Sequence, residues 1–372
     1  MEWDVAIVGG GPAGLSAAHA AASRGASTLV LERSEHPRYK TCGGGLIGIS
    51  LRCVPPGMDV PARDRIDRAT FTLDGRRAFT RRARGALLDM VQRDEFDAAL
   101  CVAAQAAGAS VRSRTTVRAI EQTEDAVRLI LAGGDEVQAR VVVGADGSAG
   151  VTGRYVGVRY DQVDLGLEVD VPTPANQAQD WRGRLLIDWG PVPGSYGWVF
   201  PKGDLLTVGV IAARGEGERT RSYLGRFLAR LGLAGLPAVH DSGHLTRCRA
   251  DGSPLRRGRV LAAGDAAGLL EPWTREGISF ALRSGALAGT AAASGDLDDY
   301  ESTVETQLAP VMRAGRRLLR LFEAHPGYCH AALATPPGWR VFSGICRGDT
   351  DLAAVIDRRT VRSALAMLDR AA

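Results

Sequence analysis

The chain is poor in lysine, in cysteine pairs and in long apolar runs. Lys40 and Lys202 are the only lysines in 372 residues, so arginine carries almost all the positive charge. The net charge is only +4, and the arginines are spread along the whole chain, which argues against nucleic-acid binding. The six cysteines form no CxxC pair and show no metal-ligand spacing with histidine. A zinc site, any other bound metal and a disulfide framework are therefore not expected.

Two further absences concern the membrane. No uninterrupted apolar stretch is long enough to span a bilayer. Nothing at the N-terminus resembles a signal peptide, because the first predicted strand already begins at Val5. We therefore expect a cytoplasmic enzyme of one elaborate domain or two, while its oligomeric state stays open.

The N-terminus carries the pattern of a dinucleotide-binding βαβ unit. Residues 4–14 read DVAIVGGGPAG, and Glu32 ends the next apolar run. Gly9 permits the tight turn, Gly11 lets the backbone approach a pyrophosphate, and Gly14 lets the helix pack on the strand. Free N–H groups at the helix start, around Ala13, are placed to bind phosphate, and Glu32 is placed to bind a ribose.

The rest of the chain interleaves β-rich and helical patterns. We expect a loop over residues 33–57, a strand over 69–73, a helix over 87–107, a meander between 110 and 143, a β-rich region over 165–213 and a helix over 278–294. The predicted fold is α/β, with a Rossmann-type nucleotide-binding domain built from residues 1–65, 90–160 and 250–300. A β-rich substrate domain comprises residues 66–89 and 161–249, and residues 301–372 form a helical C-terminal segment.

Four segments together resemble the FAD-binding signatures of p-hydroxybenzoate hydroxylase-like flavoproteins. They are the GxGxxG turn with Glu32, residues 93–97 (RDEFD), residues 144–148 (GADGS) and residues 264–268 (GDAAG). Within that superfamily, residues 39–46 (YKTCGGGL) and 196–202 (YGWVFPK) resemble the geranylgeranyl reductase family. Residues 272–278 (PWTREGI) are similar to that family's Pro-x-Thr-Gly-Glu-Gly-Ile loop, with Arg275 in place of a glycine and a bulky Trp273. The resemblance extends to about residue 300.

The resemblance implies FAD as the cofactor and adds candidate cofactor-binding residues: Gly43, Gly44, Arg93, Val117, Asp265, Gly268, Gly277 and Ile278. Asp265 follows an apolar strand, so its carboxylate is expected to accept hydrogen bonds from the ribityl hydroxyls. The N–H groups around Gly277 and Ile278 begin a helix and are expected to face the O2/N1 edge of the flavin. Arg93 is expected to reach the phosphates or the ribityl chain, although an exposed helix arginine is the commoner case.

Cys42 is the candidate catalytic residue. The three glycines that follow it leave little side-chain bulk, so the backbone there is expected to pass close to a planar ring or a substrate. A free thiol has a pKa of about 8.5, so Cys42 needs help to relay a proton. The alternative is a small residue in a packed turn.

The candidate substrate residues are aromatic side chains of one strand and two residues of the 272–278 loop, which differ from the reductase pattern. Tyr196, Trp198 and Phe200 alternate along one strand and so share a face, either as core or as an apolar wall, with Pro201 turning the chain away. Trp273 is expected to shorten the cavity, and Arg275 to bind an anionic headgroup. The substrate is then shorter or more polar-headed than a two-chain lipid.

The expected reaction is saturation of isoprenoid carbon–carbon double bonds by hydride from reduced flavin and a protein-assisted proton. No second Gly-rich fingerprint is present, so the external reductant is NAD(P)H or a reduced electron-transfer protein. The runner-up is a flavin monooxygenase or halogenase acting on an aromatic or polyketide compound, because YxWxFP is similar to the halogenases' WxWxIP. Lys40 would then be the halogenating lysine, at a poorly matching position. A non-catalytic flavin protein is the third alternative.

Residues 309–322 predict a basic amphipathic helix. Its arginines at helical spacing are Arg313, Arg316, Arg317 and Arg320, and its opposite side carries Val311, Leu318, Leu319 and Phe322. Such a helix either contacts the inner face of an anionic membrane and admits a prenyl chain, or packs on its own domain with solvated arginines.

Overall fold

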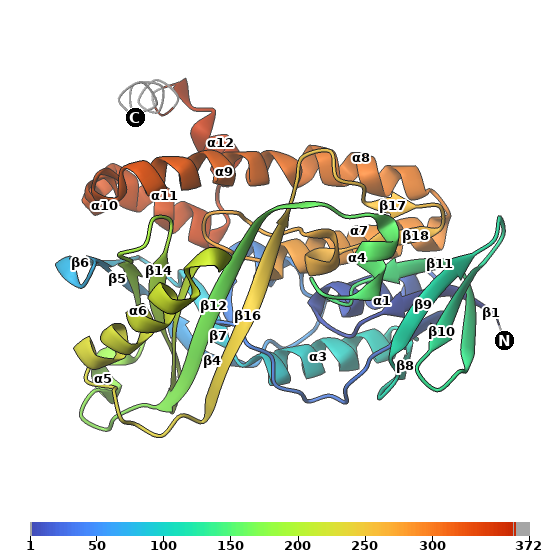
Figure 1. Cartoon of the computed structure of the whole chain (residues 1–372), viewed down its shortest axis with the longest axis horizontal. Helices are drawn as coiled ribbons and strands as arrows, with labels where there is room; N and C mark the ends of the chain where they lie inside the picture. The colour runs from blue at the N-terminus through green and yellow to red at the C-terminus, as the bar shows by residue number, and fades with distance from the viewer. Residues whose placement is uncertain (1, 360, 362–372) are drawn as a thin grey trace.

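The computed structural model describes residues 2–359 and 361, which form three sheets and a set of helices (Figure 1). The largest sheet runs in the order β17-β18-β11-β1-β2-β8, and the β9-β10 hairpin extends from β11. Its strands are β1 (Glu2–Val8), β2 (Thr28–Leu31), β8 (Ser110–Arg112), β9 (Val117–Gln122), β10 (Val127–Leu131), β11 (Glu136–Gly144), β17 (Arg256–Arg257) and β18 (Val260–Ala262).

Parallel pairing explains why this sheet is buried on both faces. β1 pairs in parallel with β2 and β11, and β11 pairs in parallel with β18. The strands are short apolar runs, as expected when helices cover both faces. The covering helices are α1 (Pro12–Ala22), α3 (Arg93–Ala106), α4 (Val151–Val156) and α7 (Ile278–Ser294). α7 approaches α1 so closely that a Cβ on Gly289 would lie 2.1 Å from the Ala17 carbonyl oxygen.

The seven-stranded sheet carries different side chains on its two faces. Its order is β16-β12-β15-β14-β13-β5-β6, antiparallel except for the β13–β5 pair. The strands are β5 (Arg68–Leu73), β6 (Arg76–Arg82), β12 (Tyr160–Pro172), β13 (Arg184–Trp189), β14 (Tyr196–Lys202), β15 (Leu205–Ala213) and β16 (His240–Arg249). One face packs Val199, Val208 and Val210 against Tyr223 and Phe227 of α6 (Gly217–Arg230). The other face is therefore free to border a cavity.

Two predicted segments differ from the structure. The expected loop over residues 33–57 contains β3 (Gly45–Ile47) and α2 (Gly48–Cys53). The expected helix over residues 87–107 begins with a strand, β7 (Leu88–Val91), and only then becomes α3. β7 lies between β3 and β4 (Ala62–Ile66) in a three-stranded sheet. A short apolar run does not distinguish strand from helix, which is why the sequence misled here.

The predicted meander is only partly present. β9, β10 and β11 are antiparallel neighbours, as expected. β8 instead pairs in parallel with β2 on the far side of the sheet. Its strand partner is thus distant in sequence, and local patterning does not reveal it.

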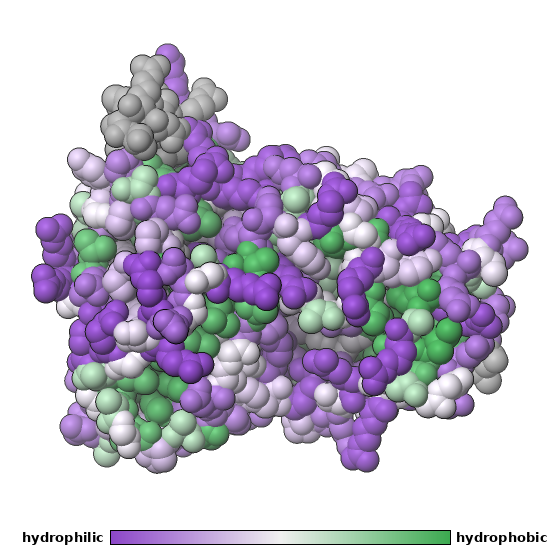
Figure 2. Space-filling view, in the orientation of Figure 1, coloured by the Kyte–Doolittle hydropathy of each residue, from purple (hydrophilic) through white to green (hydrophobic). Residues whose placement is uncertain are grey.

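The C-terminal helices form a layer along one side of the molecule (Figure 1). They are α8 (Leu297–Gln307), α9 (Ala309–Ala324), α10 (Pro326–Ala334), α11 (Pro336–Arg347) and α12 (Leu352–Ile356); a short α5 (Ala178–Trp181) lies elsewhere. Among the described residues, no helix has the length and hydropathy needed to cross a membrane. Figure 2 shows a mainly hydrophilic surface on the viewed face, with apolar residues in scattered patches.

Candidate functional site

A cavity of about 1270 Å³ lies between the nucleotide-type sheet, the seven-stranded sheet and the C-terminal helices. Single-ligand pockets usually measure about 300–1,000 Å³, so this one has room for a cofactor together with a substrate. Most of the predicted site residues line it: Gly9, Gly11, Ala13, Glu32, Cys42, Gly43, Gly44, Arg93, Val117, Tyr196, Trp198, Phe200, Asp265, Trp273, Arg275, Gly277 and Ile278.

Gly14 and Gly268 do not line the cavity. A Cβ on Gly14 would lie 1.9 Å from the Gly9 carbonyl oxygen, so Gly14 serves helix–strand packing. Gly268 ends the η2 turn (Gly264–Ala267) in the left-handed region, with φ of 66°. Both glycines therefore support the backbone next to the cavity without lining it.

The start of α1 is shaped to accept an anion. Gly11 is its N-cap, and no side chain caps the helix. Among the described residues, the amides of Ala13 and Gly14 have no hydrogen-bond partner, while Leu15 N–H bonds to the Gly11 carbonyl. A Cβ on Gly11 would meet only the Arg38 Nη2, at 3.8 Å, so the space before the helix is open. Free amides, open space and a positive dipole end fit a pyrophosphate.

Glu32 is buried and holds the glycine turn. Its Oε2 accepts the Gly10 N–H at 2.5 Å and its Oε1 accepts the Ser34 N–H at 2.9 Å. Arg38 lies beside it at 3.7 Å and also reaches Asp97 at 3.3 Å. Sequence reasoning missed Arg38, whose only signal is its place just before residues 39–46. The residues present fit the adenosine and phosphate end of FAD.

The side chain of Arg93 is only 10% exposed, against the commoner expectation of an exposed helix arginine. Its Nε and Nη2 donate to the two carboxylate oxygens of Asp97, each at 2.9 Å. Burial opposes the charge, but Asp97 outweighs it and raises the pKa of Arg93. The side chain of Cys42 is a further neighbour of this guanidinium. Arg93 therefore brings a fixed positive charge to the Cys42 loop.

Asp265 is partly buried at the cavity surface and remains an anion. It lies in the turn after β18, and His244 Nε2 is 4.0 Å from its carboxylate. Burial alone would favour the neutral acid, but His244, Lys40 and Arg93 lower the pKa of Asp265. A carboxylate held this way can accept hydrogen bonds from hydroxyl groups.

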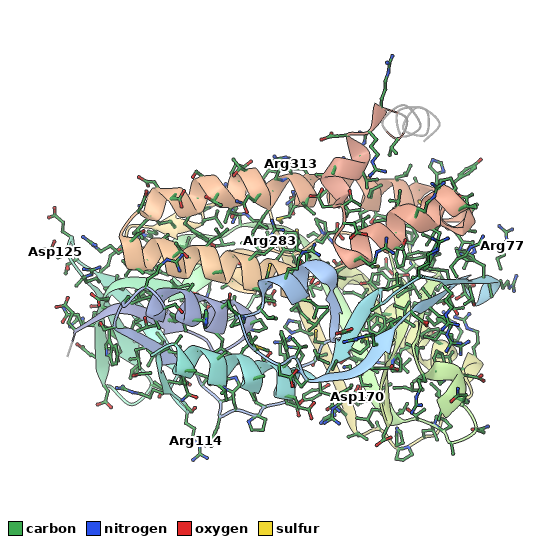
Figure 3. The ribbon with its side chains drawn as sticks, turned by 180° about the vertical axis from the view of Figure 1, so that it is seen from behind. Arg77, Arg114, Asp125, Asp170, Arg283 and Arg313 are labelled. Atoms are coloured by element: carbon green, nitrogen blue, oxygen red, sulfur yellow. The ribbon has the colours of Figure 1, made fainter. Side chains whose placement is uncertain are left out.

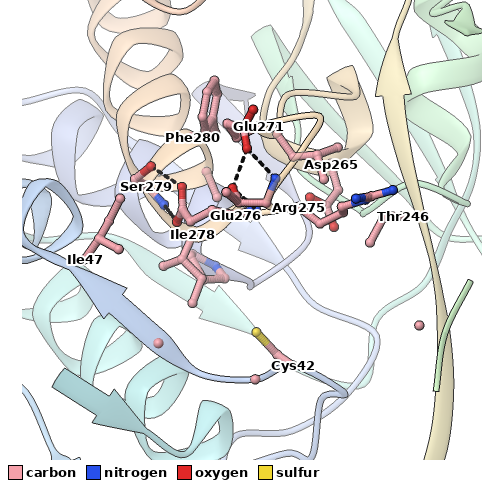
Figure 4. Close-up of a pocket in the computed structure, with 18 of the residues that line it drawn as sticks. Cys42, Ile47, Thr246, Asp265, Glu271, Arg275, Glu276, Ile278, Ser279 and Phe280 are labelled. Carbon is pink, nitrogen blue, oxygen red and sulfur yellow. Dashed lines mark hydrogen bonds between the residues drawn. The ribbon is translucent and has the colours of Figure 1, made fainter. Parts of the chain in front are cut away.

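The start of α7 brings the Glu276 carboxylate close to the amides predicted to face a flavin. The Glu276 carboxylate accepts the Ser279 N–H at 2.7 Å and also the Ser279 hydroxyl (Figure 4). It interacts with the Ile278 amide as well, and burial raises the pKa of Glu276. The Glu276 carboxylate thus bonds to the Ser279 amide and lies beside the Ile278 amide, next to the position predicted for the flavin edge.

Two ionisable side chains form hydrogen bonds with the backbone of Cys42. Its N–H donates to Glu168 Oε1 at 3.1 Å, and its carbonyl accepts from Lys202 Nζ at 3.2 Å. Figure 4 shows the sulfur pointing across the cavity toward the start of α7. Sequence reasoning missed both Glu168 and Lys202. The rarity of lysine was the one available signal, since both Lys40 and Lys202 flank Cys42.

The glycines after Cys42 admit this chain's own side chains. A Cβ on Gly43 would lie 2.8 Å from the Phe200 ring, and one on Gly44 would lie 3.2 Å from Lys202 Nζ. The space beside this backbone, where a planar ring or a substrate was expected, is therefore partly filled by side chains of β14. Pro201 does not turn the chain away, because β14 continues through Lys202, paired with Leu205.

Tyr196, Trp198 and Phe200 share one strand face and line the cavity, as the alternation predicted. Trp198 extends across β15, where a Cβ on Gly209 would lie 2.1 Å from its indole ring. Gly209 thus lets the indole lie flat on the sheet. These rings form an apolar wall that continues toward the C-terminal helices.

Arg275 does not offer its guanidinium to a headgroup. Its Nε bonds to Asp164 at 3.0 Å, and its Nη1 bonds to the carbonyls of Gly194 and Trp273. The prediction of an anion-binding role therefore loses its basis, because these donors are used within the chain. Trp273 instead packs in the wall, with ring centroids 6.2 Å from Trp189 and 5.9 Å from Phe322.

The amphipathic helix predicted over residues 309–322 is α9, and its apolar side faces inward. Phe322 is fully buried, 4.9 Å from the Trp189 ring between centroids, and Leu318 lines the cavity. Arg316 pairs with Asp161 and Asp251, while Arg313 lies on the outer side of the helix (Figure 3). The chain itself covers the apolar face that would have met a membrane.

Comparison with known proteins agrees with this geometry. The FAD binding domain family model matches residues 2–186. Digeranylgeranylglycerophospholipid reductase 1 of Methanopyrus kandleri is 32% identical over 327 residues, which cover 81% of this chain and 83% of the relative. A geranylgeranyl bacteriochlorophyll reductase-like structure from Thermoplasma acidophilum has a TM-score of 0.80 at 22% identity, with 99% of each chain covered.

The flavin-dependent brominase Bmp2 also shares the fold, with a TM-score of 0.76 at 18% identity over 100% of both chains. At that identity the likeness extends to the fold alone. The Methanopyrus kandleri reductase, in contrast, aligns over most of both chains at 32% identity. The chain therefore belongs to the geranylgeranyl reductase family of FAD-dependent oxidoreductases.

Proposed function

We propose that the protein saturates carbon–carbon double bonds of an isoprenoid substrate. The observation that carries the proposal is one continuous cavity, which joins an anion-accepting helix start to an apolar chamber at the Cys42 loop. The proposed division follows: residues 1–65, 90–160 and 250–300 make up the FAD-binding domain, residues 66–89 and 161–249 make up the substrate domain, and the described helices of the 301–372 segment cover the chamber. Residues 360 and 362–372 lie outside the described part of that segment.

Bound FAD, once reduced, supplies a hydride. The chain's residues have the remaining tasks. Trp198 and Phe200 exclude water from an apolar chain, and Arg93 and Asp265 hold polar parts of the cofactor. Cys42, whose backbone is fixed by Glu168 and Lys202, would border the bound cofactor from the sheet side of the cavity. Hydride addition to an isolated alkene also needs an acid, and a dry cavity favours the transfer.

We propose that the external reductant is NAD(P)H or a reduced electron-transfer protein. The sequence has no second Gly-rich fingerprint for a nicotinamide nucleotide. Steady-state flavin reduction by NADH, NADPH and a reduced ferredoxin, measured separately, distinguishes these donors.

The substrate we propose is shorter than a two-chain lipid. Trp273 supports this, because its indole packs against Trp189 and Phe322 and occupies the chamber wall. The polar-headgroup part of the earlier expectation depended on Arg275, whose donors are bonded within the chain.

Anaerobic single turnover tests the proposal. FAD-reconstituted protein is reduced with dithionite and mixed with geranylgeraniol, and we expect flavin reoxidation together with a product two hydrogens heavier per turnover. Cys42→Ser should slow this reoxidation and keep FAD bound. Cys53→Ser, another half-buried cysteine, is the matched control. No reoxidation by any polyprenyl compound would refute the proposed reaction.

A halogenase or monooxygenase is the second candidate, and one observation favours it. Lys40 lines the cavity, and burial lowers the pKa of its amine, which a halogenating lysine requires. Its Nζ, however, donates to the adjacent Thr41 carbonyl at 3.2 Å. Reduced protein supplied with oxygen and bromide should halogenate an aromatic acceptor if this alternative holds, and Lys40→Met should abolish the reaction.

A further inference from the structure

The seven-stranded sheet brings one carboxyl group to the cavity without a full set of partners. Glu168 of β12 is 2% exposed and lines the cavity. Its Oε1 accepts the Cys42 N–H, whereas its Oε2 is buried and has no hydrogen-bond partner among the described residues. A buried polar atom without a partner is costly, so it points to a functional role.

The register of the sheet shows what Glu168 faces. Glu168 pairs with Gly209, and Gly209 pairs with Trp198, so the three lie in one row across β12, β15 and β14. Because Gly209 has no side chain, the indole of Trp198 extends over it toward β12. The Trp198 Nε1 is also buried without a partner and lies near Gly43. Two unpartnered polar atoms therefore belong to the wall beside the Cys42 loop.

We propose that Glu168 is the acid that protonates the double bond, with Lys202 as its positioning residue. The inference rests on the proposed reductase function. One alkene carbon gains hydride, with two electrons, from dithionite-reduced FAD, and the other carbon gains the proton of the Glu168 carboxyl. FAD is oxidised, the carbon–carbon bond is reduced, and the carboxylate takes a new proton from solvent.

The surroundings of Glu168 suit this role. Burial is the main cause that raises the pKa of Glu168, to about 7, and Asp170 raises it further, while Lys202, the Cys42 amide and Lys40 lower it. Tyr39, which stacks on His240, is a further titratable group that acts on Glu168, and Cys42 and His244 line the same cavity. The carboxyl thus holds a proton near neutral pH and releases it readily.

Lys202 fixes the geometry from the opposite side. It is 6% exposed, donates to the Cys42 carbonyl and lies against Gly44. Glu168 and Lys202 therefore clamp the N–H and C=O of the same residue from β12 and β14. A clamp of this kind sets where the carboxyl lies relative to the loop.

Glu168→Gln is the principal test, because the amide oxygen can still accept the Cys42 N–H. With dithionite-reduced protein and geranylgeraniol, we expect flavin reoxidation about 100-fold slower or more, as for loss of a general acid. FAD content and dithionite reduction should not change. Asp170→Asn is the matched control: its carboxylate is two residues away and bonds to Thr207. This variant keeps the Glu168 carboxyl, so its rate should stay near that of the wild type at a pH below the Glu168 midpoint of both proteins.

A second readout needs no turnover. Infrared difference titration of the oxidised protein should show a carboxyl with a midpoint near pH 7 that Glu168→Gln removes. Lys202→Met should raise this midpoint, and Asp170→Asn should lower it, because each removes a charge that acts on Glu168. If Glu168→Gln loses FAD, Glu168→Asp replaces it, and should be slowed while keeping the pH-dependent rate.

Two results overturn the inference. One is a Glu168→Gln variant that reoxidises its flavin at the wild-type rate, and this leaves the proposed function intact. The other is the absence of any carboxyl that titrates between pH 6 and 8. A wild-type protein that no polyprenyl alcohol reoxidises refutes the proposed function itself, and this inference with it.

Discussion

The two walls of the cavity differ in the groups that they present: backbone amides on one side and side chains of distant strands on the other. The nucleotide-side wall consists of helix starts and glycine turns from short sequence segments, and the carboxylates of Glu32 and Glu276 bond to nearby backbone amides. The sheet wall combines residues from strands far apart in sequence. Several of its polar atoms, among them Glu168 Oε2 and Trp198 Nε1, have no hydrogen-bond partner among the described residues.

This difference indicates a division of labour. Backbone amides at a helix start bind phosphate with little dependence on side-chain identity, so that wall suits a cofactor. Aromatic side chains with an isolated acid suit an apolar substrate that must receive a proton. The predictions below test each side of this comparison.

The largest expected effect contrasts two glycines of the nucleotide turn. Gly11→Val should abolish FAD binding without unfolding the chain, because its Cβ enters open space where phosphate would lie. The valine would displace the phosphates from the free amides at the start of α1. Loss of two charge-assisted hydrogen bonds of about 1.5–3 kcal/mol each weakens FAD binding at least about 100-fold. Gly14→Ala should instead destabilise the fold by about 2 kcal/mol or more, since its Cβ meets the Gly9 carbonyl oxygen. Flavin absorbance and urea unfolding separate the two outcomes, and full flavin occupancy in Gly11→Val would refute the phosphate turn.

The second prediction concerns pH and the sheet wall. The pKa of Glu168 lies near 7 in the folded protein against an ordinary 4.5, so the folded state binds more protons between these values. The free energy of unfolding should therefore fall as pH rises from 4.5 to above 7, by about 3 kcal/mol in total. Urea titrations of apoprotein should show this slope in the wild type and its loss in Glu168→Gln. An equal slope in both proteins would assign the pH dependence to other groups.

The third prediction compares the two faces of the seven-stranded sheet. Gly209→Ala should displace the Trp198 indole, lower stability by about 1–3 kcal/mol and raise KM for the substrate. Val208→Ala, on the face that packs against α6, should cost a similar amount, about 2 kcal/mol, with KM unchanged. Unfolding curves and steady-state kinetics check both. A matching rise in KM for Val208→Ala would remove the distinction between the faces.

The smallest effect is on substrate length. Trp273→Ala should enlarge the chamber and improve kcat/KM for a longer polyprenyl chain about 10-fold relative to a short one. Trp339 of α11 packs in the same aromatic cluster but does not line the cavity, so Trp339→Ala is the control. The ratio of kcat/KM for the two chain lengths is the measurement, and no change in it would place Trp273 outside the substrate path.

Local sequence patterns predicted those parts whose structure depends on neighbouring residues. The βαβ unit, the helix Ile278–Ser294 and the shared face of Tyr196 and Trp198 follow from glycine spacing and periodicity, and the structure confirms them. The strand Leu88–Val91 was mistaken for helix because a short apolar run fits both periods. Arg275 was misjudged because its partner Asp164 lies 111 residues away.

The sequence by itself determined the nucleotide turn, the FAD-binding family and the aromatic strand, because short-range spacing encodes each of them. Only the tertiary structure decided that Glu168 and Lys202 meet at Cys42, from strands 126 and 160 residues away. It also decided that Glu276 caps α7 and that α9 turns its apolar face inward. The physical reason is that burial and hydrogen-bond partners set the charge and role of a side chain, and the packing of distant strands and helices creates both.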